Sequence, residues 1–166
     1  MSLQPKPTSP ATPTIRPAAI ADVPYIHDLL ETYASKGNLL PRTMSEIYRH
    51  LRDFFVIDMN GTVAAIGALE IFTEDLGEVR SLVVADQFAS QGLGRLMVRR
   101  ITAEARQIGL GRLMALTYVP EFFHKLGFNT VPVETLPEKV WSVCLKCYKY
   151  NNCDEVAVLL ELREKE

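Results

Sequence analysis

Residues 78–96 read EVRSLVVADQFASQGLGRL, a run rich in β-branched residues that leads through a glycine-containing turn into a helical pattern. The segment from Glu78 to Ala85 has the composition of a strand. From Leu93 onward, apolar residues recur every three or four positions with arginines between them, as in a helix with one buried face. We therefore predict a strand, a glycine turn and a helix in direct succession.

The turn at Gln91, Gly92 and Gly94 has the chemistry of a phosphate-binding helix start. Amide N–H groups in the first turn of a helix lack partners and carry the positive end of the helix dipole. Glycines let phosphate oxygens approach this backbone, so the turn suits a diphosphate, and Arg95 adds a charge-assisted contact. A tight turn with glycines needed only for packing is the alternative. Neither a dinucleotide fingerprint, whose third glycine is replaced by Met97, nor a P-loop is present.

The rest of the pattern predicts a mixed α/β sheet with helices on both faces. Asp22 is expected to cap the first helix, and Thr43 the second, with Glu46 completing a capping box. An Asn-Gly pair predicts a hairpin. The expected strands cover residues 54–57, 63–72, 78–85, 112–117, 128–133 and 156–162, and the expected helices lie at 22–36, 43–51, 93–108 and 120–126.

Length and composition predict one globular domain. Of 166 residues, 48% are hydrophobic and 23% charged, which suits a packed core. Residues 1–14 are rich in proline, serine and threonine, so we expect a disordered tail before a single domain at 15–166. The net charge of −2 gives no reason to expect a nucleic acid or a membrane as partner. Without a spanning segment or a signal peptide, the expected location is cytoplasmic.

Three cysteines lie close together, at Cys144, Cys147 and Cys153. Their odd number argues against a disulfide framework. The Cys-x-x-Cys spacing is a metal half-site, but a closed structural zinc site needs four ligands and no histidine lies nearby. We expect buried or free thiols and no metal, with zinc or a redox pair as the alternatives.

Residues 79–105, VRSLVVADQFASQGLGRLMVRRITAEA, and residues 121–128, EFFHKLGF, resemble the GNAT superfamily of N-acetyltransferases. The resemblance implies a mixed, mostly antiparallel twisted sheet with helices on both faces. It also implies acetyl-CoA as cosubstrate, with the diphosphate on the glycine turn and pantetheine along the preceding strand. The cofactor-binding positions are then Leu82, Val83, Val84, Gln91, Gly92, Leu93, Gly94, Arg95, Phe122 and Phe123.

Two positions depart from the GNAT motif. Ala89 stands where glutamine or arginine is usual, so a side-chain contact is lost while the backbone cradle remains. Phe123 stands where many members have a tyrosine acid, which excludes a tyrosine acid at this position because phenylalanine has no proton to give.

Residues 30–56, 76–84 and 136–141 with 153–162 resemble more narrowly the bacterial N-acetylglutamate synthases, above all their short form. That resemblance implies acetylation of the α-amine of L-glutamate, at the first step of arginine synthesis, and is compatible with a homodimer. In this family a basic residue after the first helix helps to bind the carboxylates of glutamate, and Arg42 is the matching position. The family also has a glutamate at the start of the central strand, and Glu78 is the matching position. The arginine and serine that grip the substrate near the C-terminus of two-domain members have no match, since residues 150–154 read YNNCD.

The chemistry of acetyl transfer assigns the remaining candidates. Because an α-amino group is mostly protonated at neutral pH, a proton acceptor is needed, and Glu78 is the candidate, directly or through water. Arg42, Arg80 and Lys36 are the candidate cations for the acceptor's carboxylates, with solvated surface charges as the alternative. Ser81 joins the substrate-binding candidates, although strict alternation turns it away from Glu78 and Arg80 unless a bulge intervenes.

The sequence thus predicts an acetyl-CoA-dependent transferase for L-glutamate that works by direct attack. One alternative is the same reaction on another amine, such as glutamine, a polyamine or a protein terminus. The other is a non-catalytic CoA-binding or cysteine-based sensor module.

Overall fold

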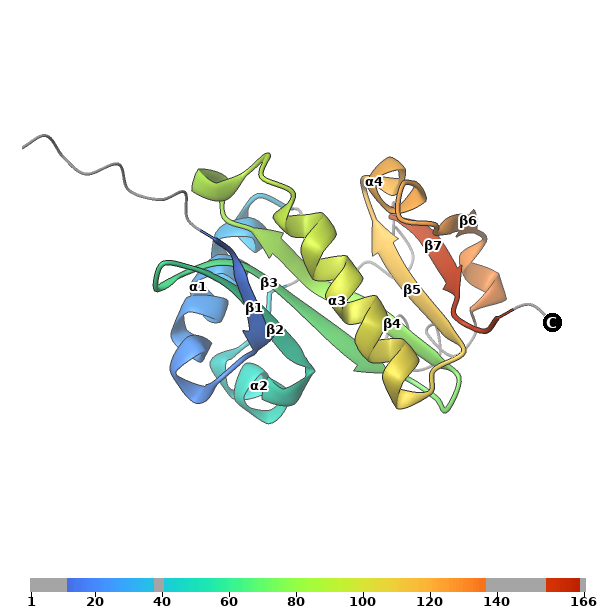
Figure 1. The fold of residues 1–166 in the computed structure, drawn as a ribbon, viewed down its shortest axis with the longest axis horizontal. Coiled ribbons are helices and arrows are strands. Elements are labelled where there is room, and N and C mark those ends of the chain that lie inside the picture. The colour runs from blue at the N-terminus through green and yellow to red at the C-terminus, as the bar shows by residue number, and fades with distance from the viewer. Residues whose placement is uncertain (1–11, 38–40, 137–154, 165–166) are drawn as a thin grey trace, which may run out of the picture.

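A computed structural model describes residues 12–37, 41–136 and 155–164. They form a seven-stranded sheet in the order β1-β2-β3-β4-β5-β7-β6 (Figure 1). Neighbouring strands are antiparallel except for β4 and β5, which are parallel, so the predicted mostly antiparallel sheet is confirmed. The strands are β1 (Thr14–Pro17), β2 (Phe54–Met59), β3 (Thr62–Ile71), β4 (Leu76–Val84), β5 (Arg112–Thr117), β6 (Asn129–Val131) and β7 (Val156–Glu161).

Helices cover both faces of the sheet, as the sequence predicts. Helix α3 crosses one face over β3 and β4, and α4 lies against β6 and β7 (Figure 1). Helices α1 and α2 bury their apolar sides on the opposite face. The helices are α1 (Val23–Ser35), α2 (Met44–Arg49), α3 (Leu93–Ile108) and α4 (Pro120–His124), with 3₁₀ turns at Ile20–Asp22, Leu51–Asp53, Asp86–Phe88 and Val133–Thr135. Among the described residues, no helix is both long and apolar enough to cross a bilayer.

Local signals set several element ends where they were predicted. Asn60 and Gly61 both have positive φ, 54° and 84°, and form the β2–β3 turn. The Oγ1 of Thr43 accepts the N–H of Glu46 at 3.1 Å and caps α2. In the apolar stripe of α3, Leu93, Met97, Ile101 and Ala105 are buried in the core as predicted, whereas Ile108 at the end of the helix is 47% exposed.

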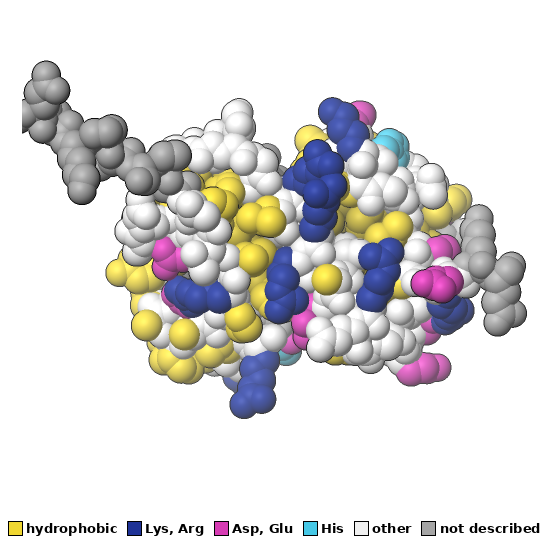
Figure 2. All heavy atoms as spheres, viewed as in Figure 1, with side chains coloured by type: hydrophobic (Ala, Val, Ile, Leu, Met, Phe, Trp, Pro, Cys, Tyr) yellow, Lys and Arg dark blue, Asp and Glu magenta, His cyan; other side chains and the backbone are white. Residues whose placement is uncertain are grey.

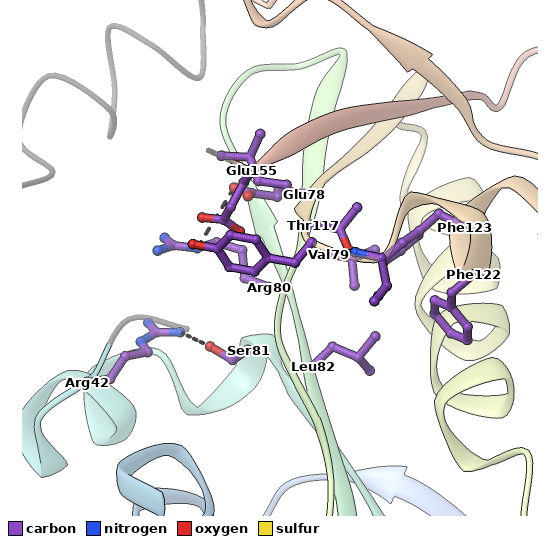
Figure 3. Close-up of a pocket in the computed structure, with 13 residues that line it drawn as sticks. Arg42, Glu78, Val79, Arg80, Ser81, Leu82, Thr117, Phe122, Phe123 and Glu155 are labelled. Carbon is purple, nitrogen blue, oxygen red and sulfur yellow. Dashed lines mark hydrogen bonds and ion pairs between the residues drawn. The ribbon is translucent and has the colours of Figure 1, made fainter. Parts of the chain in front are cut away.

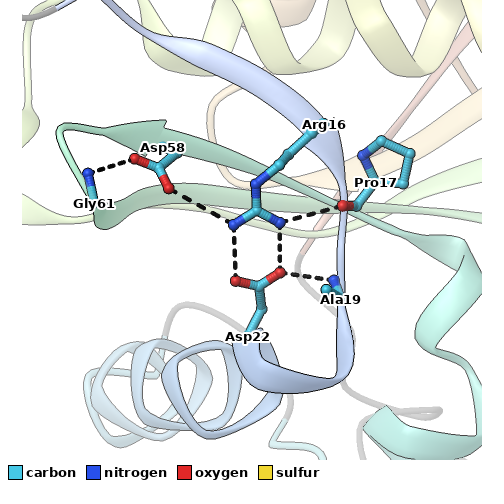
Figure 4. A network of polar contacts seen from close by, with 6 residues as sticks. All are labelled: Arg16, Pro17, Ala19, Asp22, Asp58 and Gly61. Atoms are coloured by element: carbon cyan, nitrogen blue, oxygen red, sulfur yellow. Dashed lines mark hydrogen bonds and ion pairs between the residues drawn. The ribbon is translucent and has the colours of Figure 1, made fainter.

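Asp22 is the N-cap residue of α1, as predicted, but its side chain makes no capping hydrogen bond to that helix. Its carboxylate instead forms a two-pronged ion pair with Arg16 of β1, at 2.7 and 3.0 Å (Figure 4). The same carboxylate accepts the N–H of Ala19 at 2.7 Å and so closes the 3₁₀ turn Ile20–Asp22 that precedes α1. These hydrogen bonds, that from Arg16 above all, lower the pKa of Asp22, although burial opposes the shift. Asp22 therefore ties the edge strand to α1.

We expect Asp22→Asn to lower the free energy of unfolding by about 1–2 kcal/mol at neutral pH. Because the pKa of Asp22 is lowered in the folded state, its contribution is present above the ordinary value of 3.8 and is lost as the pH falls through the folded value. In urea unfolding, the difference in the free energy of unfolding between wild type and variant should therefore shrink as the pH falls from about 5 to about 2. Asp28→Asn, at an exposed aspartate of α1, is the control, and a gap unchanged by acid would contradict the assignment.

Strands β4 and β5 pair over only part of their length. The parallel pairing runs from Leu76 with Arg112 to Glu78 with Met114. Both strands continue beyond it, to Val84 and Thr117. Beyond Glu78 the two strands therefore separate, and an opening forms in the middle of the sheet.

Strand β4 also carries a bulge in its pairing with β3. The paired residues on either side are Ile66 with Val83 and Ala68 with Arg80. Between these pairs β3 has one residue, Gly67, whereas β4 has two, Ser81 and Leu82. Ser81 takes the extra step in the left-handed region, with φ 54°. A Cβ on Gly67 would lie 2.7 Å from Cγ of Met97, so the missing side chain lets α3 pack closely behind the bulge.

Candidate active site

A cavity of about 380 Å³ opens where β4 and β5 separate (Figure 3). Strand β4 supplies one wall, and the end of β5 with the following loop and α4 supplies the other. Two further side chains come from outside these elements, one before α2 and one before β7. The lining residues are Arg42, Glu78, Val79, Arg80, Ser81, Leu82, Leu116, Thr117, Tyr118, Val119, Phe122, Phe123 and Glu155.

The bulge brings Ser81 to this cavity. Strict alternation would place Ser81 on the face of the sheet opposite Glu78 and Arg80. The extra residue of the bulge shifts this alternation, so that the side chain of Ser81 lies on the cavity side. The Nη1 of Arg42 donates to the Oγ of Ser81 at 3.4 Å (Figure 3). A serine hydroxyl and a guanidinium from two distant segments therefore meet in one pocket.

Glu78 and Arg80 lie on the cavity side of β4, as predicted from alternation. The side chain of Glu78 is only 4% exposed, and its Oε2 lies 3.9 Å from the Nε of Arg80. Arg80 also donates through Nη1 to Glu70, which stands directly opposite Glu78 on β3. Arg80 thus shares its charge between two carboxylates, and the guanidinium is held in place by both.

Arg42 approaches the same cavity from the chain just before α2. Its guanidinium carbon lies 5.1 Å from the centre of the Phe54 ring, a cation–π distance. Burial, and after it the positive charge of Arg80, lowers the pKa of Arg42. Two partly buried guanidinium groups with like charge in one cavity favour an anionic ligand, because a carboxylate relieves their repulsion and matches their planar geometry.

The predicted phosphate turn is open at the start of α3. Gly92 is the N-cap residue with φ 78°, and Ser90 before it also has positive φ, 64°. A Cβ built on Gly92 meets no atom within 4 Å, so the backbone there borders free space. Together with the unpartnered amides expected in the first helical turn, this geometry fits a diphosphate. Gln91 and Arg95 are exposed beside it.

Gly94 joins this turn to the aromatic wall of the cavity. A Cβ on Gly94 would lie 3.4 Å from the ring of Phe122, at the tight end of van der Waals contact. Phe122 meets Phe123 edge to face at 5.0 Å, and Phe123 is buried against Phe128 in the same way at 5.2 Å. The space for a diphosphate and the cavity are therefore neighbours, separated by the side chain of Phe122.

The other predicted cofactor positions divide between the two faces of β4. Leu82 lines the cavity, whereas Val83 is buried in the core formed with α1. The carbonyl of Val84 accepts the hydroxyl of Tyr33, and Leu93, the first residue of α3, is buried in the core. Side-chain contact with a ligand in the cavity is thus open to Leu82, while Val83 and Leu93 can offer only backbone groups.

Lys36 lies outside the cavity and has another partner. Its Nζ is 3.1 Å from Asp86 and 4.7 Å from the centre of the Tyr33 ring. The hydroxyl of Tyr33 lies 2.5 Å from Asp86, and burial together with this hydrogen bond raises the pKa of Tyr33 to about 12. Lys36 therefore joins the end of α1 to the 3₁₀ turn Asp86–Phe88 that follows β4.

Four polar residues at or beside the cavity were not predicted from the sequence. Thr117 is the last residue of β5, Tyr118 follows it, and Glu155 immediately precedes β7. Glu70 reaches the site through Arg80. The end of a predicted strand is a usable signal for Thr117 and Tyr118, since residues at the end of β5 face the opening beside β4. The positions of Glu155 and Glu70 depend on strand pairing, which the sequence pattern alone does not specify.

The metal prediction falls largely outside the described residues. Cys144, Cys147 and Cys153 all lie in the range 137–154. Among residues 12–37, 41–136 and 155–164, no group of three or more histidine, cysteine, aspartate or glutamate side chains is placed to hold a metal ion.

Sequence comparison identifies relatives that match most of the chain. The sequence model of the acetyltransferase (GNAT) family matches residues 23–128. An uncharacterized N-acetyltransferase of Chlorobaculum tepidum is 37% identical over 154 residues, covering 92% of this chain and 99% of that protein. The amino-acid acetyltransferase of Mycobacterium tuberculosis is 33% identical over 139 residues, covering 82% of this chain and 79% of the relative.

Solved structures agree with this result. The N-acetylglutamate synthase of Neisseria gonorrhoeae, solved with coenzyme A and N-acetyl-glutamate, gives a TM-score of 0.83 at 29% identity, covering 94% of this chain and 36% of that chain. A Mycobacterium tuberculosis protein solved in complex with CoA gives a TM-score of 0.78 at 30% identity, over 90% of this chain and 99% of that one. This chain therefore spans about a third of the gonococcal enzyme. The family match, the relatives and the fold confirm the resemblance seen in the motifs: the chain belongs to the GNAT family of acetyltransferases.

Proposed function

We propose that this chain transfers the acetyl group of acetyl-CoA to the α-amine of L-glutamate. The observation that carries the proposal is the convergence of Arg42, Arg80 and Ser81 on one cavity with the buried carboxylate of Glu78. Two guanidinium groups suit the two carboxylates of a dicarboxylic amino acid, and Glu78 suits its amine. The relatives named amino-acid acetyltransferase and the neighbour solved with N-acetyl-glutamate support this choice.

Acetyl-CoA supplies an activated acyl group, and the chain supplies the positions for its two ends. The amides from Gly92 to Arg95 hold the diphosphate at the dipole end of α3. Pantetheine then follows β4 past Phe122, and the thioester reaches the gap beyond Glu78. Placing amine and thioester side by side removes most of the entropic barrier, which is worth about 7–11 kcal/mol in well-aligned cases.

Glu78 accepts the proton that the amine must lose. Arg80, whose Nε lies 3.9 Å from Oε2 of Glu78, balances the charge of this carboxylate and holds it in place. The proton passes to Glu78 directly or through a water between the amine and the carboxylate. Backbone N–H groups of β4 around Leu82 and Val83 are the donors for the oxyanion that forms on attack, since the strand has left β5 at this point. The thiolate leaves as the anion and takes its proton from water.

We expect Arg42→Ala to raise the KM for glutamate about 30-fold or more and the KM for acetyl-CoA less than threefold. The reason is that Arg42 contacts Ser81 and the acceptor end of the cavity, not the phosphate turn. Initial rates with each substrate varied in turn give both constants. Arg49→Ala, at an exposed arginine of α2, is the matched control. Equal effects on both KM values would contradict the role of Arg42.

Thiol release from acetyl-CoA with a panel of amines tests the function itself. We expect turnover with glutamate, and a much lower kcat/KM with spermidine or with a peptide amino terminus, because neither brings two carboxylates to the arginines. Higher kcat/KM with glutamine would assign the second carboxylate position to an amide. Tight CoA binding without turnover of any amine would instead support the non-catalytic sensor.

A further inference from the structure

The segment that joins β4 to the phosphate turn has few contacts of its own. From Asp86 to Gly92 every residue except Phe88 is exposed, and Ser90 and Gly92 have positive φ. Within the described part of the chain, Asp86 is the only residue from 86 to 92 whose side chain makes a hydrogen bond or an ion pair. The place of the turn therefore depends on Phe88, which packs against the core, and on how Asp86 is held.

The side chain that holds Asp86 is Tyr33, near the C-terminal end of α1. Its hydroxyl lies 2.8 Å from the carbonyl of Val84 and 2.5 Å from Oδ1 of Asp86, so its single proton is donated to one or the other acceptor. Lys36 adds a second link, because its Nζ lies 3.1 Å from Oδ2 of Asp86 and 4.7 Å from the centre of the Tyr33 ring. Tyr33 thus joins α1 to the last residue of β4 and to the 3₁₀ turn that follows it.

Tyr33 is itself held by packing. Its ring lies against the apolar core between α1 and the sheet, in which Leu30, Ile47 and Phe54 are fully buried. A side chain that packing has already ordered loses little further rotamer freedom when it forms a hydrogen bond, whereas a free surface side chain loses more. The hydroxyl of Tyr33 is therefore a fixed group, and it sets the positions of Val84 and Asp86.

The phosphate turn needs this support because its ligand contacts come from the backbone. Residues 86–92 contain no lysine or arginine, and the basic side chains visible in Figure 2 stand along the line of α3. Backbone amides bind a diphosphate when several of them point to it at once. A segment that must first become ordered lowers the affinity for a ligand, and a segment held beforehand avoids that cost.

We propose that Tyr33 is a positioning residue for coenzyme binding, which fixes Val84 and Asp86 and thereby holds the phosphate turn in its binding conformation. Tyr33 does not touch the ligand and takes no part in the chemistry. The identity of the ligand, coenzyme A, rests on the proposed function, whereas the hold of Tyr33 on the turn does not.

Tyr33→Phe removes only the hydroxyl and tests this proposal. In calorimetry the Kd for coenzyme A should rise about five- to tenfold, as expected for the loss of one hydrogen bond that orders the site. The KM for acetyl-CoA should rise by a similar factor, while kcat and the KM for glutamate change less than twofold. Tyr25→Phe makes the same change at a tyrosine of α1 that is 61% exposed, and it should bind coenzyme A as wild type does.

Hydrogen exchange in the free protein tests the hold on the turn without any ligand. The N–H groups of Phe88 and Ala89 donate to the carbonyls of Ala85 and Asp86 at 2.9 and 3.1 Å. Both amides should exchange at least threefold faster in Tyr33→Phe than in wild type or Tyr25→Phe, because the turn opens more often once Asp86 is released. Exchange within α3 should stay the same in all three proteins.

The two measurements separate this proposal from the proposed function. If wild type does not bind coenzyme A, the proposed function fails, and the exchange rates then decide alone: faster exchange in Tyr33→Phe supports the hold on the turn, and equal exchange overturns it. If wild type binds coenzyme A, equal affinity of wild type and Tyr33→Phe would overturn the positioning role. A matching rise in both KM values would also overturn it, because it would show a general loss of structure.

Discussion

Gly92→Ala is expected to weaken the binding of coenzyme A about 10- to 100-fold. Gly92 has φ 78°, a conformation that alanine adopts only with strain of about 1 kcal/mol. More importantly, the added methyl group enters the space that now borders the backbone, where no atom lies within 4 Å. Phosphate oxygens could then no longer reach the amides. Calorimetry with coenzyme A measures the loss directly.

Gly61→Ala is the matched control for this experiment. Gly61 also has positive φ, 84°, and a Cβ there also meets nothing within 4 Å, but it lies in the β2–β3 turn. Both variants should lose similar stability in urea, about 1 kcal/mol, whereas only Gly92→Ala should lose affinity. If the two variants bind coenzyme A equally well, the helix start does not hold the diphosphate.

Glu78→Gln is expected to lower kcat about 100-fold or more while the KM for glutamate changes less than threefold. Glutamine keeps the volume of the buried side chain but cannot accept the proton of the amine. Steady-state rates across a range of pH measure the effect. Because deprotonated amine becomes more abundant as pH rises, the variant should recover part of its activity in alkaline buffer.

Glu70→Gln separates the loss of a proton acceptor from the loss of an ion pair. Glu70 stands opposite Glu78 and bonds the same Arg80, but it does not line the cavity. We expect Glu70→Gln to lower kcat less than fivefold. A large loss in both variants would assign the effect to the position of Arg80, and a loss in neither would remove Glu78 from the mechanism.

Most of the fold could be predicted from the sequence because its signals are local. The Asn-Gly turn, the Thr43 cap and the stripe on α3 each act within a few residues, and each is found. Asp22 occupies the predicted N-cap position, but its carboxylate binds another partner, because an aspartate before a helix can serve either a cap or an ion pair. Arg16, six residues earlier, forms an ion pair with this carboxylate, and no local sequence pattern predicts that partner.

The candidate site was harder to predict because it depends on irregular pairing. Alternation correctly places Glu78 and Arg80 together, but it turns Ser81 away, and the bulge reverses that result. A bulge is a property of two strands in register, so one strand's sequence does not reveal it. Lys36 lies at the expected end of α1 but turns to Asp86, a contact set by tertiary packing.

A crystal structure of the chain with coenzyme A and N-acetyl-glutamate tests the central claim most directly. We predict that the diphosphate lies on the amides from Gly92 to Arg95, and that the two carboxylates of the product contact Arg42 and Arg80 beside Glu78. A diphosphate bound elsewhere, or a product whose carboxylates point away from both arginines, would contradict the account.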